Sequence, residues 1–83
     1  MIDGLPTLTS DDIEIDERGM KAIATFVFPD GTRFPIHIST FTLDNWTGRS
    51  DAREVRTAVL RRSATLAQVA RSGRKNRRKK IKI

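Results

Sequence analysis

The most constraining feature of the sequence is a Pro-Asp-Gly turn at 29–31, between two segments in which apolar residues recur at every second position. This alternation is typical of strands with one buried face, and we expect strands at 20–28 and 33–39. A two-residue turn would place Pro29 in a hydrogen-bonded pair, although proline has no N–H to donate. The sequence therefore predicts a three-residue loop with Gly31 in the left-handed conformation.

This loop determines which residues of the hairpin share a face. It sets Phe28 opposite Thr32, and the pairs that follow are Phe26 with Phe34, Ala24 with Ile36, and Ala22 with Ile38. We expect this face to be the core, because it collects the large apolar side chains. The other face is mixed and carries an apolar strip open to another segment or to a partner. Its residues are Lys21, Ile23, Thr25, Val27, Arg33, Pro35 and His37.

The residues before the hairpin predict a further strand with an acidic outer face. Ile13 and Ile15 alternate with acidic residues, so the carboxylates point outward. Along one face of a strand they are spaced about 6.5 to 7 Å apart, which is too far to share one cation. We interpret them as a solubilising face, or as a surface that binds a charged partner, formed by Asp12, Glu14 and Asp16.

The second half of the chain predicts helix. A short turn or a single helical turn is expected within 39–48, ended by Gly48, and the main helix begins at Ser50 or Asp51. Its apolar stripe at 3.6-residue spacing faces the sheet, and Gly73 is the expected end of the helix. The stripe consists of Ala52, Val55, Val59, Leu66 and Ala70, with Ser63 as a polar interruption.

These elements predict an α+β fold with a three-stranded antiparallel meander packed by one main C-terminal helix, with a short helical turn between them. A chain of 83 residues is expected to form a single domain. We divide it into an N-terminal segment at 1–10, the domain at 11–73, and a disordered basic tail at 74–83.

Composition restricts the chemistry that we expect. The chain has no cysteine and a single histidine, so we predict no disulfide, no metal, no cofactor and no catalytic constellation. The first ten residues lack the basic start and apolar run of a secretion signal, and no apolar stretch reaches about 18 residues. The expectation is a non-enzymatic cytoplasmic protein with no membrane partner.

Charge is distributed unevenly along the chain. Residues 1–40 carry seven acidic and three basic residues, whereas residues 41–83 carry three acidic and thirteen basic residues. Such asymmetry points to nucleic acid or to an acidic partner at the basic end. The tail has no aromatic residue to stack on bases, so contacts to the phosphate backbone are expected. The predicted nucleic-acid-binding residues are Arg71, Arg74, Lys75, Arg77, Arg78, Lys79, Lys80 and Lys82, helped by Arg53 and Arg56 of the helix.

Other functions remain open on the sequence alone. The tail is also compatible with a solubilising end, and the helix arginines with a solvated face. A protein-interaction module is the main alternative, such as a mobile-element-encoded inhibitor or adaptor that uses the acidic strand face against nucleic-acid-handling machinery. A structural subunit of a larger assembly is a third option. The sequence does not separate DNA from RNA, and it leaves the oligomeric state open.

Overall fold

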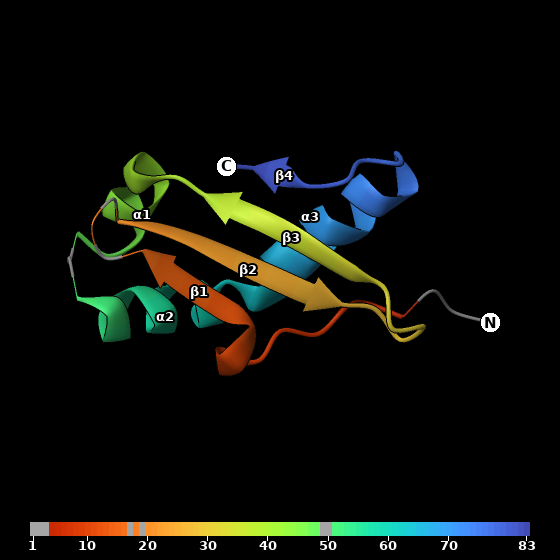
Figure 1. Ribbon diagram of the computed structural model, residues 1–83, viewed down its shortest axis with the longest axis horizontal. Helices are drawn as coiled ribbons and strands as arrows, with labels where there is room; N and C mark the ends of the chain where they lie inside the picture. Colours follow the sequence, from red (N-terminus) through yellow and green to blue (C-terminus); the bar gives the residue numbers. More distant parts are fainter. Residues whose placement is uncertain (1–3, 17, 19, 49–50) are drawn as a thin grey trace.

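The computed structural model describes residues 4–16, 18, 20–48 and 51–83, which form an α+β fold (Figure 1). Within these ranges a four-stranded sheet is combined with three α-helices. In chain order the elements are the 3-10 turn η1 (Ser10–Asp12), β1 (Ile13–Asp16), β2 (Lys21–Val27), β3 (Arg33–Ile38), α1 (Thr40–Trp46), α2 (Ala52–Arg61), α3 (Ser63–Lys75) and β4 (Ile81–Lys82).

The strand order follows the chain, β1-β2-β3-β4, with the first three strands antiparallel and β4 parallel to β3. The predicted hairpin register is confirmed: Phe26 pairs with Phe34, Ala24 with Ile36, and Ala22 with Ile38. The three-residue loop is also confirmed. Phe28 N donates to Thr32 O at 2.8 Å, Gly31 N donates to Phe28 O at 2.8 Å, and Gly31 has a φ of +90°.

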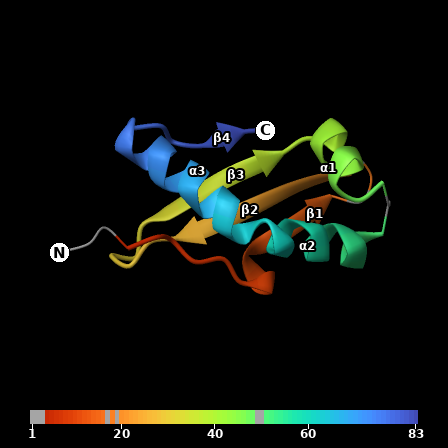
Figure 2. The same cartoon turned by 180° about the vertical axis from the view of Figure 1, so that it is seen from behind.

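The core lies between the sheet and the helices. Helices α2 and α3 cross one face of the sheet, and α1 lies at the end of the sheet where β3 ends (Figure 2). The predicted core face is buried, and Phe26 and Ile36 of the sheet meet Val55 and Val59 of α2 within one apolar cluster. In the part of the chain that the structure describes, no helix covers the opposite face of the sheet, which we call the open face.

The prediction of one main helix is wrong in detail, because the segment divides into α2 and α3 at Arg62. Asp51 caps α2 by accepting a hydrogen bond from Arg53 N at 3.0 Å, whereas the alternative start at Ser50 lies outside the described residues. Helix α2 packs on β1 and α3 packs on β3. The chain changes direction at Arg62, just before Ser63 interrupts the apolar stripe, so that each half follows a different part of the twisted sheet.

Gly73 does not end the helix as expected, since α3 continues to Lys75. A Cβ at position 73 would lie 2.6 Å from Cδ1 of Ile81 and 2.7 Å from Cζ of Phe34. Gly73 is buried, and it lets the helix backbone approach the sheet more closely than a side chain would allow. Its role is therefore close packing and not termination.

The prediction of a disordered tail is also wrong. After α3 the chain turns back and adds β4 to the sheet, which makes the predicted three strands into four. Ile83 N donates to His37 O at 2.8 Å, and Ser39 N donates to Ile83 O at 2.7 Å. Ile81 packs against the core cluster on the side of α3. Two apolar residues at the very end of the chain thus anchor the basic segment to the fold.

Candidate nucleic-acid interface

The last turn of α3 sets the geometry of the basic segment. Arg78 N donates to Gly73 O at 2.9 Å and Arg77 N donates to Arg74 O at 3.0 Å, the two hydrogen bonds of a Schellman motif. Arg77 holds the left-handed position of this motif with a φ of +60°, where glycine is usual. The motif reverses the chain, so that the cations after Arg77 are placed by a defined backbone and not by a free arm.

Six predicted cations are exposed around this turn, and we call them the basic corner. They lie on the last two turns of α3 and on the loop to β4, together at one end of the molecule (Figures 1 and 2). No ion pair to an acidic side chain is formed by any of them within the described residues. The basic corner consists of Arg71, Lys75, Arg77, Arg78, Lys79 and Lys80.

Arg74 has a different environment from its neighbours. Its guanidinium pairs with the Asp30 carboxylate and lies over the Phe28 ring, 4.3 Å from the ring centroid. Hydrogen bonds from the Thr32 backbone and side chain and from Arg74 lower the pKa of Asp30 from 3.8 to about 2. Arg74 therefore links α3 to the tip of the β2–β3 hairpin, and the hairpin acid neutralises its charge.

Lys82, the last predicted cation, lies on the open face. It pairs in register with His37 of β3, while its neighbour Ile81 faces the core. Lys82 is thus exposed on a different surface from the cations of the turn.

The two helix arginines are not brought to the basic corner. Both lie on the first turns of α2, which begins at the end of the molecule opposite to the last turn of α3 (Figure 2). Arg53 is exposed there. Arg56 is partly buried and donates from Nη2 to Ile13 O at 3.4 Å, and its buried Nε has no hydrogen-bond partner among the described residues. Arg56 therefore faces β1 rather than solvent.

The three predicted acidic residues also divide. Asp12 ends η1 instead of lying in the strand, and its side chain is only 20 % exposed. Its carboxylate accepts from Thr9 Oγ1 at 3.0 Å and pairs with Arg33 Nη2 at 3.5 Å. Glu14 and Asp16 are exposed on β1, and Asp16 accepts from Arg18 N at 3.0 Å. The acidic edge at β1 lies across the sheet from the basic edge at β4.

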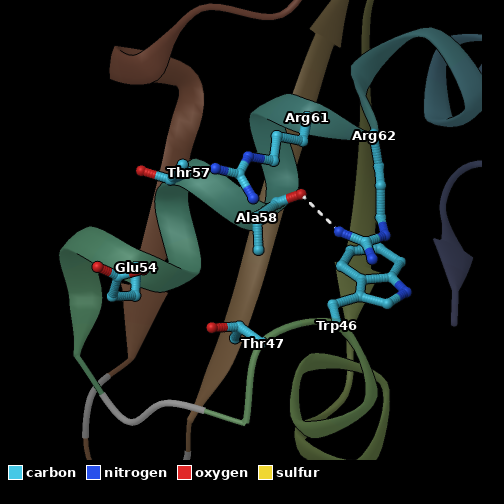
Figure 3. A pocket seen from close by; sticks show the side chains of 7 residues that line it. All are labelled: Trp46, Thr47, Glu54, Thr57, Ala58, Arg61 and Arg62. Atoms are coloured by element: carbon cyan, nitrogen blue, oxygen red, sulfur yellow. Dashed lines mark hydrogen bonds between the residues drawn. The ribbon is translucent and has the colours of Figure 1, made fainter.

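A groove between α1 and α2 contains a contact between an arginine and a tryptophan that the sequence alone does not predict (Figure 3). The Arg62 guanidinium lies over the Trp46 ring, 4.7 Å from its centroid, and Arg62 Nη1 donates to Ala58 O at 3.2 Å. Glu54 and Arg61 on the same wall carry opposite charges. Trp46 remains partly buried against the core. The groove thus has mixed charge, and the guanidinium of Arg62 is already held by Ala58 O and the Trp46 ring.

A second groove, between α3 and β4, adjoins the basic corner. It is about 460 Å³ in volume and is lined mainly by short or polar side chains. Arg78 lines it together with Ser72 and Asn76, and Ile81 lines it from β4. The groove adjoins exposed cations, but most of its lining surface is apolar, so the cations outside it are the better candidates for phosphate contacts.

No family model, curated protein or solved structure matches the chain. Within the described ranges no helix has the length and apolar character needed to cross a bilayer. The same part of the chain holds no group of three or more His, Cys, Asp or Glu side chains placed to ligate a metal ion.

Proposed function

We propose that the protein binds nucleic acid through the basic corner, by contacts to phosphates that do not depend on base sequence. The observation that carries this proposal is the exposure of six cations around one ordered turn, with no acidic partner among the described residues. Each Lys or Arg that neutralises a phosphate releases condensed counterions, so such a cluster gives affinity without a base-reading element.

The basic corner has an ordered backbone, in contrast to the disordered tail that the sequence predicts. The Schellman turn and β4 hold the segment in place, so less conformational entropy is lost on binding than for a flexible arm. No residue of the basic segment is aromatic, so stacking on bases contributes nothing. The proposed contacts are therefore electrostatic, and Arg77 and Arg78 at the tip of the turn are their centre.

The alternative interaction module has weaker support. Asp12 pairs with Arg33 and its side chain is only 20 % exposed, whereas Glu14 and Asp16 are exposed on β1. Two carboxylates form a smaller phosphate mimic than the three that the sequence predicts. We keep this alternative as the outcome to expect if nucleic acid does not bind.

The test is a polarisation titration of labelled random DNA duplex and of structured RNA, with two variants that remove equal charge. The double variant Arg77→Gln with Arg78→Gln removes two cations of the basic corner. The matched control, Arg18→Gln with Arg61→Gln, removes two exposed cations elsewhere. We expect the first pair to weaken binding at least tenfold and the control to weaken it less than threefold. The reason is that a cation in contact with a phosphate contributes more to the affinity than a cation far from the nucleic acid.

Equal effects of the two variants would show that only net charge matters and that the basic corner is not a site. Absence of binding by the unmodified protein at about 0.05 M salt, where non-specific electrostatic binding is strong, would reject nucleic acid as the ligand. A comparison of the DNA and RNA titrations selects between the two polymers.

A further inference from the structure

One register row crosses the open face with opposite charges at its two ends. Glu14 pairs in register with Ile23, Ile23 with His37, and His37 with Lys82. The row therefore runs from an acid on the β1 edge, over the two central strands, to a base on the β4 edge. In the next row, Thr25 of β2 pairs with Pro35 of β3.

Within the described part of the protomer, the two end charges lie too far apart to pair with each other. Three strand spacings separate Glu14 from Lys82, about 14 Å in total, with the side chains of Ile23 and His37 between them. Among the residues that the structure describes, neither Glu14 nor Lys82 takes part in an ion pair. The centre of the face is mainly apolar and no described helix covers it, although its side chains are only partly exposed: Ile23, Thr25, Val27, Pro35 and His37.

We propose that the open face binds a second copy of this chain, related by a two-fold axis that runs parallel to the strands between the two sheets. This rotation exchanges the two edges, so β1 of one protomer lies over β4 of its partner. A two-fold rotation has no translation along its axis, so each register row lies over the same row of the partner. Glu14 then faces the partner's Lys82, and Ile23 faces the partner's His37.

The charges select this axis over the other aligned one. A two-fold axis in the plane but perpendicular to the strands would place β1 over β1 and β4 over β4, which brings Glu14 near the partner's Glu14. Packed sheets lie about 10 Å apart, a distance that extended Lys and Glu side chains together span. The axis along the strands thus forms two equivalent ion pairs, and the perpendicular axis forms like-charge contacts. Such an interface is isologous, as in most homodimers.

The interface is small, because the edge strands β1 and β4 have only four and two residues. We expect a total buried area at or below about 1,200 Å² and a dimer that dissociates on dilution. The ion pairs lie at the rim, so salt also weakens the dimer: the Debye length falls from about 10 Å at 0.1 M salt to about 3 Å at 1 M.

The experiment is sedimentation velocity over a concentration series with nucleic-acid-free protein. Glu14→Lys and Lys82→Glu each replace both symmetric ion pairs by repulsions, so each variant should be monomeric where the unmodified chain is dimeric. In an equal mixture of the two variants, every rim contact joins opposite charges, so a heterodimer should form. The double variant that carries both changes should dimerise by itself.

Two further substitutions are the controls. Asp44→Lys and Arg61→Glu make the same charge changes at exposed positions on α1 and α2, and both should leave the dimer unchanged. Far-UV circular dichroism checks the fold of each variant, and recovery of the dimer by the mixture excludes misfolding as the cause of dissociation. The proposal is overturned if the unmodified chain stays monomeric at millimolar concentration, if the controls dissociate as the face variants do, or if the mixture stays monomeric. It does not depend on nucleic-acid binding.

Discussion

Gly73 lies inside α3, whereas Arg77 occupies the left-handed position that ends the helix. Both placements oppose simple helix-ending rules, under which glycine ends helices and arginine extends them. The contacts explain the first, because Phe34 and Ile81 occupy the space that a side chain at position 73 would need. The second places a cation at the tip of the turn, and backbone strain of this kind occurs often at functional sites.

Replacement of Gly73 by Ala tests the close approach. Helix propensity alone would favour Ala by about 1 kcal/mol, whereas overpacking of a filled core costs about 1 to 3 kcal/mol. The Phe34 ring is 3 % exposed and has little room to move, so we expect a net loss of about 1 kcal/mol in the free energy of unfolding. Denaturant melts measure it, with exposed Ser72→Ala in the same turn as a control that should change stability by less than about 0.5 kcal/mol. A more stable Gly73→Ala variant would contradict the packing role.

Replacement of Arg77 by Gly should separate stability from binding. Glycine adopts a positive φ without strain, so we expect the free energy of unfolding to rise by about 0.5 to 1 kcal/mol. Nucleic-acid affinity should fall several-fold because one phosphate contact is lost. The matched variant Arg77→Ala loses the same charge but keeps the strain, so it should bind equally weakly without gaining stability. Unchanged affinity in both variants would remove Arg77 from the proposed site.

The β2–β3 hairpin and α3 are joined at their tips as well as through the core. The Asp30–Arg74 pair and the Arg74–Phe28 contact fasten the hairpin loop to the last turn of the helix. This link positions the start of the basic corner relative to the sheet. It also explains why Arg74, although exposed, is left out of the basic corner: its charge is paired with Asp30.

Low pH should weaken the Asp30–Arg74 link between the β2–β3 hairpin and α3. The pKa of Asp30 is about 2 in the folded protein, against 3.8 for an unperturbed aspartate side chain, so the folded state favours the ionised carboxylate. Its contribution to stability is therefore fully present above about pH 4 and is lost as the pH falls toward 2. Thermal melts of Asp30→Asn should show a shallower decline over this window than the unmodified protein. Arg74→Gln should show an intermediate decline, since the Thr32 bonds remain; a decline in Asp30→Asn as steep as in the unmodified protein would assign the acid sensitivity to other groups.

In the whole molecule, the uneven distribution of charge along the chain becomes an uneven distribution of charge between the two edges of the sheet. The acidic first strand and the basic last strand form opposite edges of one sheet, because the strand order follows the chain. The basic corner lies on the last turns of α3 and on the loop to β4, whereas Glu14 and Asp16 lie at the β1 edge. Under the proposed function, a polyanion would approach the basic corner from the side away from Glu14 and Asp16, because these carboxylates repel it.

Salt dependence should report how many phosphates the basic corner contacts. With about five or six contacts on duplex DNA, the plot of log affinity against log salt should have a slope near −5. Each replacement of a cation of the basic corner by Gln should reduce the slope by about 1, with little dependence on nucleotide sequence. Arg56→Gln is the control, because Arg56 faces Ile13 and should leave the slope unchanged. A slope close to zero in polarisation titrations would contradict phosphate binding.

The sequence by itself determined the β2–β3 hairpin, its register, its loop and its core face. These features are local: the Pro29–Gly31 turn chemistry and the period-2 alternation act on neighbouring residues, so the information lies within one short segment.

Only the tertiary structure determined the conformation of the last residues of the chain. Ile81 and Ile83 are two apolar residues after a long charged run. Their contribution to the fold depends on Phe34, Gly73 and His37, which are distant in sequence. The same holds for the break at Arg62, the burial of Gly73 and the inward position of Arg56. Each is set by contact with an element that is remote in the chain, and neither local propensity nor periodicity carries that information.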